Sequence, residues 1–229
     1  MAERLPNHFL ESADAGVNVD FIDLVSGKGM VQFFMGRTAS GYRLSTTAFY
    51  SKSIFTLSDP HSEQTYTKFQ DIDYDADFKR GVTIDGVAIF SIPMAVTSSQ
   101  ALNVSNYAYV RVRKWDGTTE TEIASISGQV FLSNLGATEK EIMVDGIEIT
   151  IPRTSFKAGE SLRITTELYA FQNGGGTGFG VAFCHDPKGR LVNAHEDMEK
   201  WNDGVVMDFS STTSATTIAT ALIPFKVDI

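Results

Sequence analysis

Cysteine is nearly absent from this chain. Cys184 is the only cysteine among 229 residues, so the sequence provides no pair for a disulfide within the chain. It ends the apolar stretch Val181 to Cys184, which predicts a buried and unreactive thiol. The stability of the fold must therefore come from packing and hydrogen bonding, without a disulfide.

Basic residues and long apolar runs are also scarce. The chain has 19 Lys and Arg against 28 Asp and Glu, a net charge of −9. A nucleic-acid binder needs a basic stripe that neutralises phosphates, and an anionic membrane attracts basic segments. No apolar run approaches the roughly 20 residues of a membrane-spanning helix, and residues 1–10 lack the basic and apolar regions of a secretory signal. We therefore expect no nucleic-acid partner, no membrane attachment, and synthesis in the cytoplasm without a signal peptide.

Motifs for catalysis and cofactor binding are missing as well. The four histidines have no spacing typical of a zinc site, and we expect ordinary surface or loop residues at His8, His61, His185 and His195. No Gly-x-Ser-x-Gly elbow occurs, and Ser26–Gly29 lacks the glycine spacing and the Lys-Ser/Thr pair of a Walker loop. These absences predict no catalytic residue, no cofactor and no enzymatic activity. A hydrolase whose acidic residues are brought together by the fold is an alternative that spacing alone leaves open.

Three Asp-Gly pairs with alternating flanks are the most informative feature that is present. Each lies between alternating apolar and polar residues: Asp85-Gly86, Asp116-Gly117 and Asp145-Gly146. Asp-Gly suits the two central positions of a type I′ turn, so each pair predicts a β-hairpin with a two-residue loop. Such loops place Ile84 opposite Val87, Arg113 opposite Glu120, Arg111 opposite Glu122, and Val144 opposite Ile147. One face of each hairpin is then apolar, and the other is polar or charged.

Further alternating segments extend this pattern along the chain. The expected strands include residues 30–35, 41–44, 53–57, 161–171, 179–184, 205–209 and 221–227. About a dozen short strands at this spacing predict an all-β protein, an antiparallel β-sandwich of jelly-roll-like type. We expect residues 76–229 to form the sandwich and residues 1–75 to form a less regular N-terminal arm with a few strands. Only residues 193–201 have a helical composition.

The densest acidic cluster has four aspartates at alternate positions: Asp71, Asp73, Asp75 and Asp77. Such carboxylates could converge on Ca²⁺, which takes six to eight oxygen ligands. The segment does not match an EF-hand loop, because Ala76 stands at the sixth position and Val82 at the twelfth. If the segment is extended, all four carboxylates lie on one solvated face. The solvated face is the favoured interpretation, and the calcium site is the alternative.

Aromatic residues share one face of the hairpin predicted around Asp116-Gly117. Tyr107, Tyr109 and Trp115 fall on the same side of the strand, with two arginines between them. Such a face is either a stacking platform for sugars or a surface that packs against another layer or subunit. We expect an interaction surface here, and packing is favoured over sugar binding.

Two stretches of the sequence resemble β-sandwich structural proteins of tailed bacteriophage particles. They are Val110 to Ile123 and Phe156 to Arg163, and His185-Asp186-Pro187 after a strand is similar in style. The resemblance implies a jelly-roll-like component of the virion, in the first place a capsid decoration or cement protein, with no catalytic residues. It implies the major capsid protein or other virion proteins as partners, and a homo-oligomer for which we expect a trimer. The alternatives are a head–tail or tail structural protein, and a carbohydrate-binding β-sandwich module that could itself be virion-borne.

Overall fold

The structure, a computed structural model, describes residues 17–18, 28–52, 55–57, 64–98, 102–136, 140–173, 178–188 and 218–226. Within these ranges the chain forms thirteen strands and no helix. The strands in chain order are β1 (Val17–Asn18), β2 (Lys28–Thr38), β3 (Gly41–Ser45), β4 (Phe55–Leu57), β5 (Thr67–Asp77), β6 (Val82–Ser98), β7 (Leu102–Trp115), β8 (Glu120–Ser127), β9 (Phe131–Leu135), β10 (Lys140–Phe156), β11 (Ser161–Asn173), β12 (Phe179–Cys184) and β13 (Ala219–Lys226). Residues 193–201 and 205–209, where the sequence predicts a helix and a strand, lie outside the described residues.

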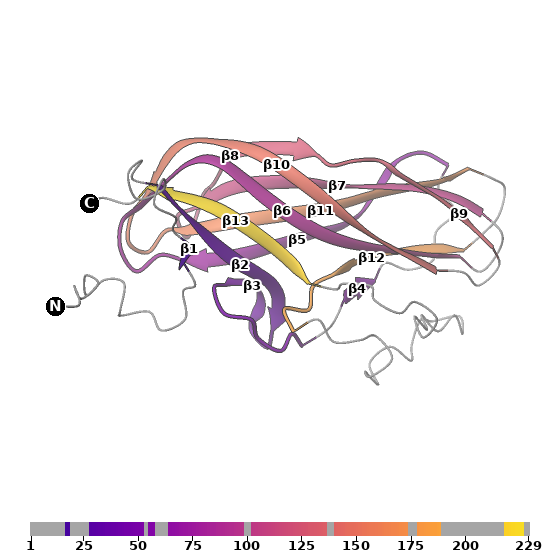
Figure 1. Ribbon diagram of the computed structural model, residues 1–229, viewed down its shortest axis with the longest axis horizontal. Coiled ribbons are helices and arrows are strands. Elements are labelled where there is room, and N and C mark those ends of the chain that lie inside the picture. The colour runs from indigo at the N-terminus through magenta and orange to yellow at the C-terminus, as the bar shows by residue number, and fades with distance from the viewer. Residues whose placement is uncertain are drawn as a thin grey trace.

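The thirteen strands belong to one sheet that doubles back on itself to form two layers (Figure 1). The first layer contains β10, β6, β13 and β2, and the second contains β5, β11, β7 and β8. Strand β3 joins the layers, because it pairs with β2 and, through the single parallel pair Arg43–Asp75, with β5. The other pairs among the described strands are antiparallel. The predicted all-β sandwich is confirmed.

Alternation along the strands places the core between the two layers. In β5, Ile72 and Tyr74 are buried, while the aspartates that alternate with them face outward. Phe90 of β6 and Ile164 of β11 are fully buried on the inner faces of the two layers. Cys184 is buried at the end of β12, and burial raises the pKa of its thiol to about 12. The prediction that Cys184 is buried is therefore confirmed, and its low reactivity stays a prediction that the raised pKa supports.

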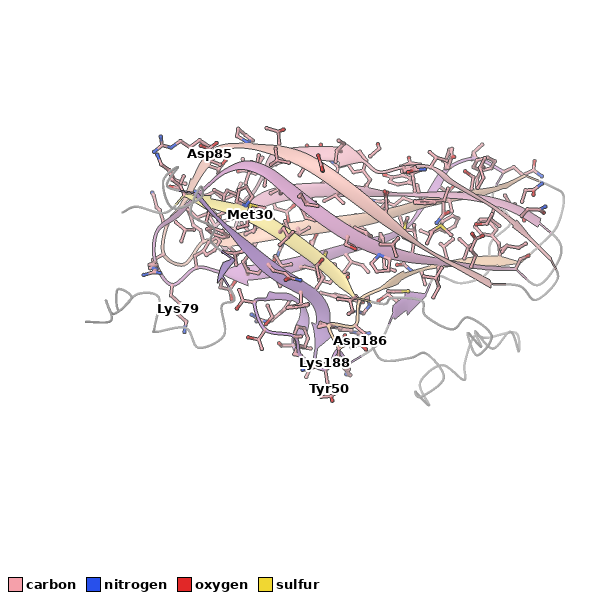
Figure 2. The ribbon with its side chains drawn as sticks, in the orientation of Figure 1. Met30, Tyr50, Lys79, Asp85, Asp186 and Lys188 are labelled. Carbon is pink, nitrogen blue, oxygen red and sulfur yellow. The ribbon has the colours of Figure 1, made fainter. Side chains whose placement is uncertain are left out.

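Two of the three Asp-Gly pairs do not form hairpins. Strand β6 runs through Asp85-Gly86 and β10 runs through Asp145-Gly146, and the two strands pair with each other. The hairpins predicted at these positions are therefore wrong. Gly86 has a φ of 133° and pairs with Ile151, where the register between the strands shifts. A bulge bends a strand and favours glycine, so this Asp-Gly pair marks the curved end of β6, where Asp85 lies (Figure 2).

Asp145 takes part in a contact between β10 and the connection from β8 to β9. It is 3% exposed, and its Oδ2 accepts a hydrogen bond of 2.9 Å from the backbone N–H of Gln129. Burial raises the pKa of this carboxyl, and the hydrogen bond from Gln129 opposes that shift. A Cβ at Gly128 would overlap Oδ2 of Asp145 and lie 2.8 Å from Cδ1 of Ile147. The carboxyl therefore fills the space that a side chain at residue 128 would need.

Replacing Gly128 by alanine is expected to lower the free energy of unfolding by about 1–3 kcal/mol, because the buried Asp145 carboxyl has to move. Gly146→Ala is the matched control, since an added Cβ at Gly146 has nothing within 4 Å. Urea denaturation of the two variants measures the difference in stability. Equal losses in both would contradict the close packing at Gly128.

The third pair, Asp116-Gly117, forms the predicted hairpin between β7 and β8. Gly117 has a φ of 95°, and Oδ1 of Asp116 accepts hydrogen bonds of 2.9 and 2.7 Å from the N–H groups of the two threonines after the pair. The loop has four residues instead of two, so Trp115 pairs with Glu120 and Arg113 with Glu122. The predicted register is therefore wrong by two residues, because a longer loop with its own side-chain hydrogen bonds replaces the type I′ turn.

Strands from the first third of the chain belong to the same sheet. The strands predicted at residues 30–35 and 41–44 are confirmed as β2 and β3, and β4 covers the end of the predicted segment 53–57. Strand β5 crosses residue 75 and pairs with β11 in the second layer. The division of the chain at residue 75 into an arm and a sandwich stays a prediction.

Candidate functional site

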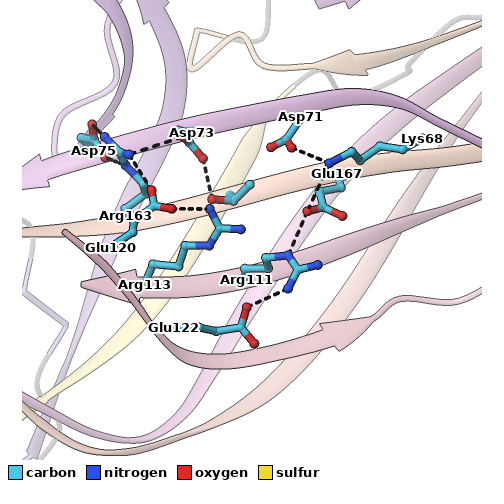
Figure 3. Close-up of polar contacts among 11 residues, drawn as sticks. Lys68, Asp71, Asp73, Asp75, Arg111, Arg113, Glu120, Glu122, Arg163 and Glu167 are labelled. Carbon is cyan, nitrogen blue, oxygen red and sulfur yellow. Dashed lines mark hydrogen bonds and ion pairs between the residues drawn. The ribbon is translucent and has the colours of Figure 1, made fainter. Parts of the chain in front are cut away.

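The outer face of the second layer carries rows of opposite charge. Because side chains alternate along a strand, every second residue of β5, β11, β7 and β8 points away from the core. The register aligns residues of three strands in rows, such as Asp75, Arg163 and Arg113. We call this surface the charged face (Figure 3), and its members are Lys68, Asp71, Asp73, Asp75, Asp77, Arg111, Arg113, Glu120, Glu122, Arg163, Thr165 and Glu167.

Arg163 is the centre of one ion-pair group on this face. Its Nε and Nη2 bind the two carboxylate oxygens of Asp75 at 2.7 and 2.8 Å, and its Nη1 binds Glu120 at 2.6 Å. Glu120 also accepts a hydrogen bond of 2.8 Å from Arg113, and the Arg163 guanidinium lies 4.7 Å from the centre of the Trp115 ring. Hydrogen bonding to Asp75 is the main cause that raises the pKa of Arg163. The bidentate pair and its neighbours therefore link β5, β11 and β8 through one guanidinium.

Glu167 is the buried member of a second ion-pair group. Its side chain is 3% exposed, and its carboxylate accepts hydrogen bonds of 2.8 Å from Nε of Arg111 and 2.8 Å from the Tyr169 hydroxyl. Nζ of Lys68 lies 3.8 Å away, and the Arg111 guanidinium also binds Glu122 at 2.7 Å. The hydrogen bond from Arg111 lowers the pKa of Glu122, whereas burial and the bond to Glu167 raise the pKa of Tyr169 to about 12. Three different donors thus converge on the Glu167 carboxylate.

The two charge pairs expected at the β7–β8 hairpin are confirmed. Arg111 contacts Glu122 and Arg113 contacts Glu120, at 2.7 and 2.8 Å. Both contacts differ from the Cα register, which places Arg113 opposite Glu122. Long side chains reach diagonal neighbours about 7–8 Å away across a strand pair. The charges therefore meet although the predicted register is wrong.

The four aspartates of β5 lie on the charged face, as expected for an extended segment. Asp71 binds Lys68 at 2.6 Å, and the two central aspartates both contact Arg163. Within the described residues, no group of three or more His, Cys, Asp or Glu side chains is arranged to hold a metal ion. Calcium binding at Asp71–Asp77 stays a prediction, and an ion there would have to displace basic side chains.

The three aromatic residues noted in the sequence share this outer face but have different surroundings. The guanidinium of Arg163 covers the Trp115 ring, and the guanidinium of Arg111 lies 4.7 Å from the centre of the Tyr109 ring. Tyr107 instead stacks on Tyr169, with ring centres 5.1 Å apart and planes 5° from parallel. Cation–π contacts occupy ring faces that a sugar would need. A common platform of all three residues stays a prediction.

The sequence reasoning missed the residues that surround Tyr107. Tyr66 makes edge contacts with Tyr107 and Phe171, with ring centres 5.1 and 4.6 Å apart, and its hydroxyl binds that of Ser105 at 2.7 Å. We call Tyr66, Tyr107, Tyr169 and Phe171 the aromatic cluster. The alternation of β11 could have placed Tyr169 and Phe171 on this face. Tyr66 precedes β5 and carries no strand signal.

His185 follows β12 directly and is fully buried, whereas the sequence predicts a surface or loop residue. Its Nε2 contacts the Thr56 hydroxyl at 2.9 Å, and that hydroxyl contacts the Tyr42 hydroxyl at 2.7 Å. Oγ of Ser51 lies 3.5 Å from Nδ1 of His185 and accepts a hydrogen bond from the backbone N–H of Arg37. Burial lowers the pKa of His185 to about 4, so the ring is neutral near pH 7. A serine and a neutral histidine thus face each other away from solvent, since Ser51 is 3% exposed.

The outer face of the first layer is apolar where that of the second is charged. We call it the apolar face. Its apolar members include Met30 (labelled in Figure 2), Phe34, Val87, Ile89, Val144 and Leu222, and the same alternation places the uncharged polar residues Gln32, Ser91, Thr150 and Thr220 among them. Val87, Val144 and Ile89 are 46%, 41% and 39% exposed. Leu222 pairs with Ile89, which in turn pairs with Glu148, a charged residue within this area. Strands β13, β6 and β10 therefore supply neighbouring apolar positions that face outward.

No protein-family model matches this chain, and no curated protein matches it. Similar solved structures include a CocE/NonD family hydrolase from Staphylococcus aureus, at 13% identity and a TM-score of 0.41, covering 84% of this chain and 36% of that chain. An aminopeptidase from the marine sediment archaeon Thaumarchaeota archaeon matches at 8% identity and a TM-score of 0.45, covering 85% of this chain and 36% of that one. The VP2 subviral particle of infectious bursal disease virus matches at 10% identity and a TM-score of 0.30, covering 87% of this chain and 51% of the VP2 chain. This chain thus spans about a third of the hydrolase chains and about half of VP2.

These matches bear on two expectations. The prediction that the protein is not an enzyme is contradicted, because several of the similar structures are hydrolases. The expectation of a β-sandwich virion protein is matched in part, since viral VP2 is among the similar structures. None of these similar structures supports the narrower expectations of a bacteriophage protein and of a capsid decoration protein. Separately, the described residues contain no helix that is long and apolar enough to cross a membrane.

Proposed function

We propose that the protein is a structural component of a bacteriophage particle, a decoration or cement protein that docks on the capsid through its apolar face. The observation that carries this proposal is the exposure of three aliphatic side chains, Val87, Ile89 and Val144, which are 39–46% exposed on the outer face that β6 and β10 share. An exposed apolar patch with few charges is typical of a protein–protein interface. The resemblance of residues 110–123 and 156–163 to phage particle proteins supports the same role.

The two outer faces of the sandwich suit different surroundings. On the charged face, acidic and basic side chains pair with one another, so their charges are already compensated within the chain. On the apolar face, contact with a second apolar surface would remove area from water, which stabilises association by about 25 cal/mol per Å². The partner that we propose is therefore the major capsid protein, offering an uncharged apolar patch to the first layer.

Ile89→Lys is expected to reduce the number of copies bound per particle at least tenfold, because docking would remove the added ammonium group from water, together with the Glu148 carboxylate opposite it, and this desolvation costs more than their attraction returns. Quantitative immunoblotting across a density gradient of intact particles from the natural source measures this number. The wild-type chain should band with the particles at many copies each. Val130→Lys is the matched control, because Val130, between β8 and β9, is 48% exposed, compared with 39% for Ile89, and does not belong to the apolar face.

Absence of the wild-type chain from the particle band would overturn the proposal, and so would equal losses in the two variants. A few copies per particle would place the protein at the neck or tail instead of the capsid. Sedimentation of the free protein measures its oligomeric state, for which we expect a trimer. If Ile89→Lys converted that oligomer to monomers, the apolar face would belong to the contact between copies of this chain.

A further inference from the structure

A small hollow lies on the outer face of the second layer, beside the aromatic cluster. It forms where β9 and β11 flank the first residues of β7, at the end of the sandwich where Figure 1 labels β9. The hollow is lined by Asn103, Val104, Ser105, Leu132, Ser133, Asn134 and Phe171. None of these described residues is charged, so the chemistry of the hollow favours a neutral ligand.

The polar residues of this hollow include two asparagines on neighbouring strands, beside Ser105 and Ser133. Asn103 and Asn134 are direct cross-strand partners on β7 and β9, and both are exposed. Each side-chain amide offers two N–H donors and one carbonyl acceptor. Hydroxyl groups also donate and accept, so two neighbouring hydroxyls on a ligand would match the pair.

The apolar groups of the hollow are an aliphatic side chain and an aromatic ring. Leu132 is 80% exposed, and Phe171 packs against the edge of Tyr66 with ring centres 4.6 Å apart. Tyr66 is tied to the sheet by its 2.7 Å hydrogen bond with Ser105. The Phe171 ring is therefore held in place before a ligand arrives, which lowers the entropic cost of binding. Apolar surface beside a few fixed polar groups is the usual composition of a small-molecule site.

We propose that this hollow binds a neutral saccharide. The amides of Asn103 and Asn134 bind its hydroxyl groups, while the C–H face of a sugar ring packs on Phe171 and Leu132. The site lies on the layer opposite the apolar face, so it is separate from the capsid contact proposed above. It is also distinct from a platform that includes Tyr109 and Trp115, whose rings are covered by guanidinium groups.

Titration of the ¹⁵N-labelled full chain with maltotriose, cellotriose and chitotriose tests this proposal. At least one of these neutral trisaccharides should give saturable amide shifts with a Kd in the millimolar range or tighter. The shifts should concentrate in residues 102–106 and 131–135, which form the two facing strand segments. Leu132→Asp should weaken binding at least tenfold, and the exposure of Leu132 makes this variant compatible with folding. Asn134→Ala, also at an exposed position, should weaken it by a similar factor.

Trp115→Ala is the control and should bind as the wild type does. The proposal is overturned if none of the three trisaccharides gives saturable shifts. It is also overturned if binding survives in Leu132→Asp but is lost in Trp115→Ala, because the site would then be the other aromatic surface. Tighter binding of a sulfated analogue than of the neutral sugar would contradict the uncharged chemistry assigned to the hollow. None of these outcomes depends on particle binding, which Ile89→Lys tests.

Discussion

Replacing Glu167 by glutamine is expected to lower the free energy of unfolding by about 2–4 kcal/mol, since Arg111 and Tyr169 lose the buried carboxylate that accepts their hydrogen bonds. The Glu167 side chain is 3% exposed, and the groups around it are donors from Arg111, Tyr169 and Lys68. A glutamine of the same size would place its own N–H₂ group among these donors, where part of it finds no acceptor. Urea denaturation at pH 7 measures the loss.

Glu122→Gln is the matched control, because Glu122 binds the same Arg111 guanidinium. Its side chain is 42% exposed, compared with 3% for Glu167, so the solvent screens this pair. We expect a loss below about 1 kcal/mol, shrinking further in 0.5 M NaCl, whereas the loss in Glu167→Gln should persist. Similar losses in the two variants would contradict the prediction, because they would show that the burial of Glu167 does not determine how much its ion pair with Arg111 contributes to stability.

Stability should also fall by up to about 3 kcal/mol as the pH is lowered from 6.5 to 4, through His185 alone. Burial lowers the pKa of this imidazole from 6.5 to about 4 on folding. In this window the unfolded chain binds a proton that the folded chain does not. The stabilisation is therefore complete above pH 6.5 and is lost as the pH falls towards 4.

His185→Gln isolates this effect, because glutamine can still hydrogen-bond Thr56 but does not titrate. Urea denaturation at several pH values measures how steeply the free energy of unfolding changes with pH. Between pH 4 and 6.5 this slope should be smaller in the variant than in the wild type by about 1.4 kcal/mol per pH unit. Asp145 acts with the opposite sign, because its pKa is raised by burial and its contribution is lost as the pH rises through that pKa. A slope unchanged by His185→Gln would contradict the burial of this ring.

The hairpin at Asp116-Gly117 could be predicted because its signals are local. The turn residues and the alternating charges of β7 and β8 lie within one short stretch of sequence. The pairs Asp85-Gly86 and Asp145-Gly146 carry the same local signal, but they lie within β6 and β10, which pair across a long separation in the chain. That pairing satisfies the backbone along both strands, and it outweighs the preference of two residues for a turn.

The candidate sites could be predicted only in part, for a related reason. Alternation placed Asp73 and Asp75 on one face of an extended segment, but it could not show that Arg163 of β11 would bind them. Phe171 and Asn134 lie far apart in the sequence, and they line one hollow only because β11 and β9 both flank β7. Nor could the sequence show that the guanidinium groups of Arg111 and Arg163 stack on Tyr109 and Trp115.

By itself, the sequence determined the all-β class, the buried Cys184 and the charge contacts of one hairpin. These properties depend on a two-residue periodicity and on how far a side chain reaches, and both can be read from neighbouring residues. Only the tertiary structure decided that β6 pairs with β10, that His185 is buried, and that Arg163 links three strands. Those properties depend on which strands become neighbours. The free energy that determines which strands pair comes from packing and hydrogen bonding between residues that are remote in the sequence. A local sequence pattern therefore cannot predict this pairing.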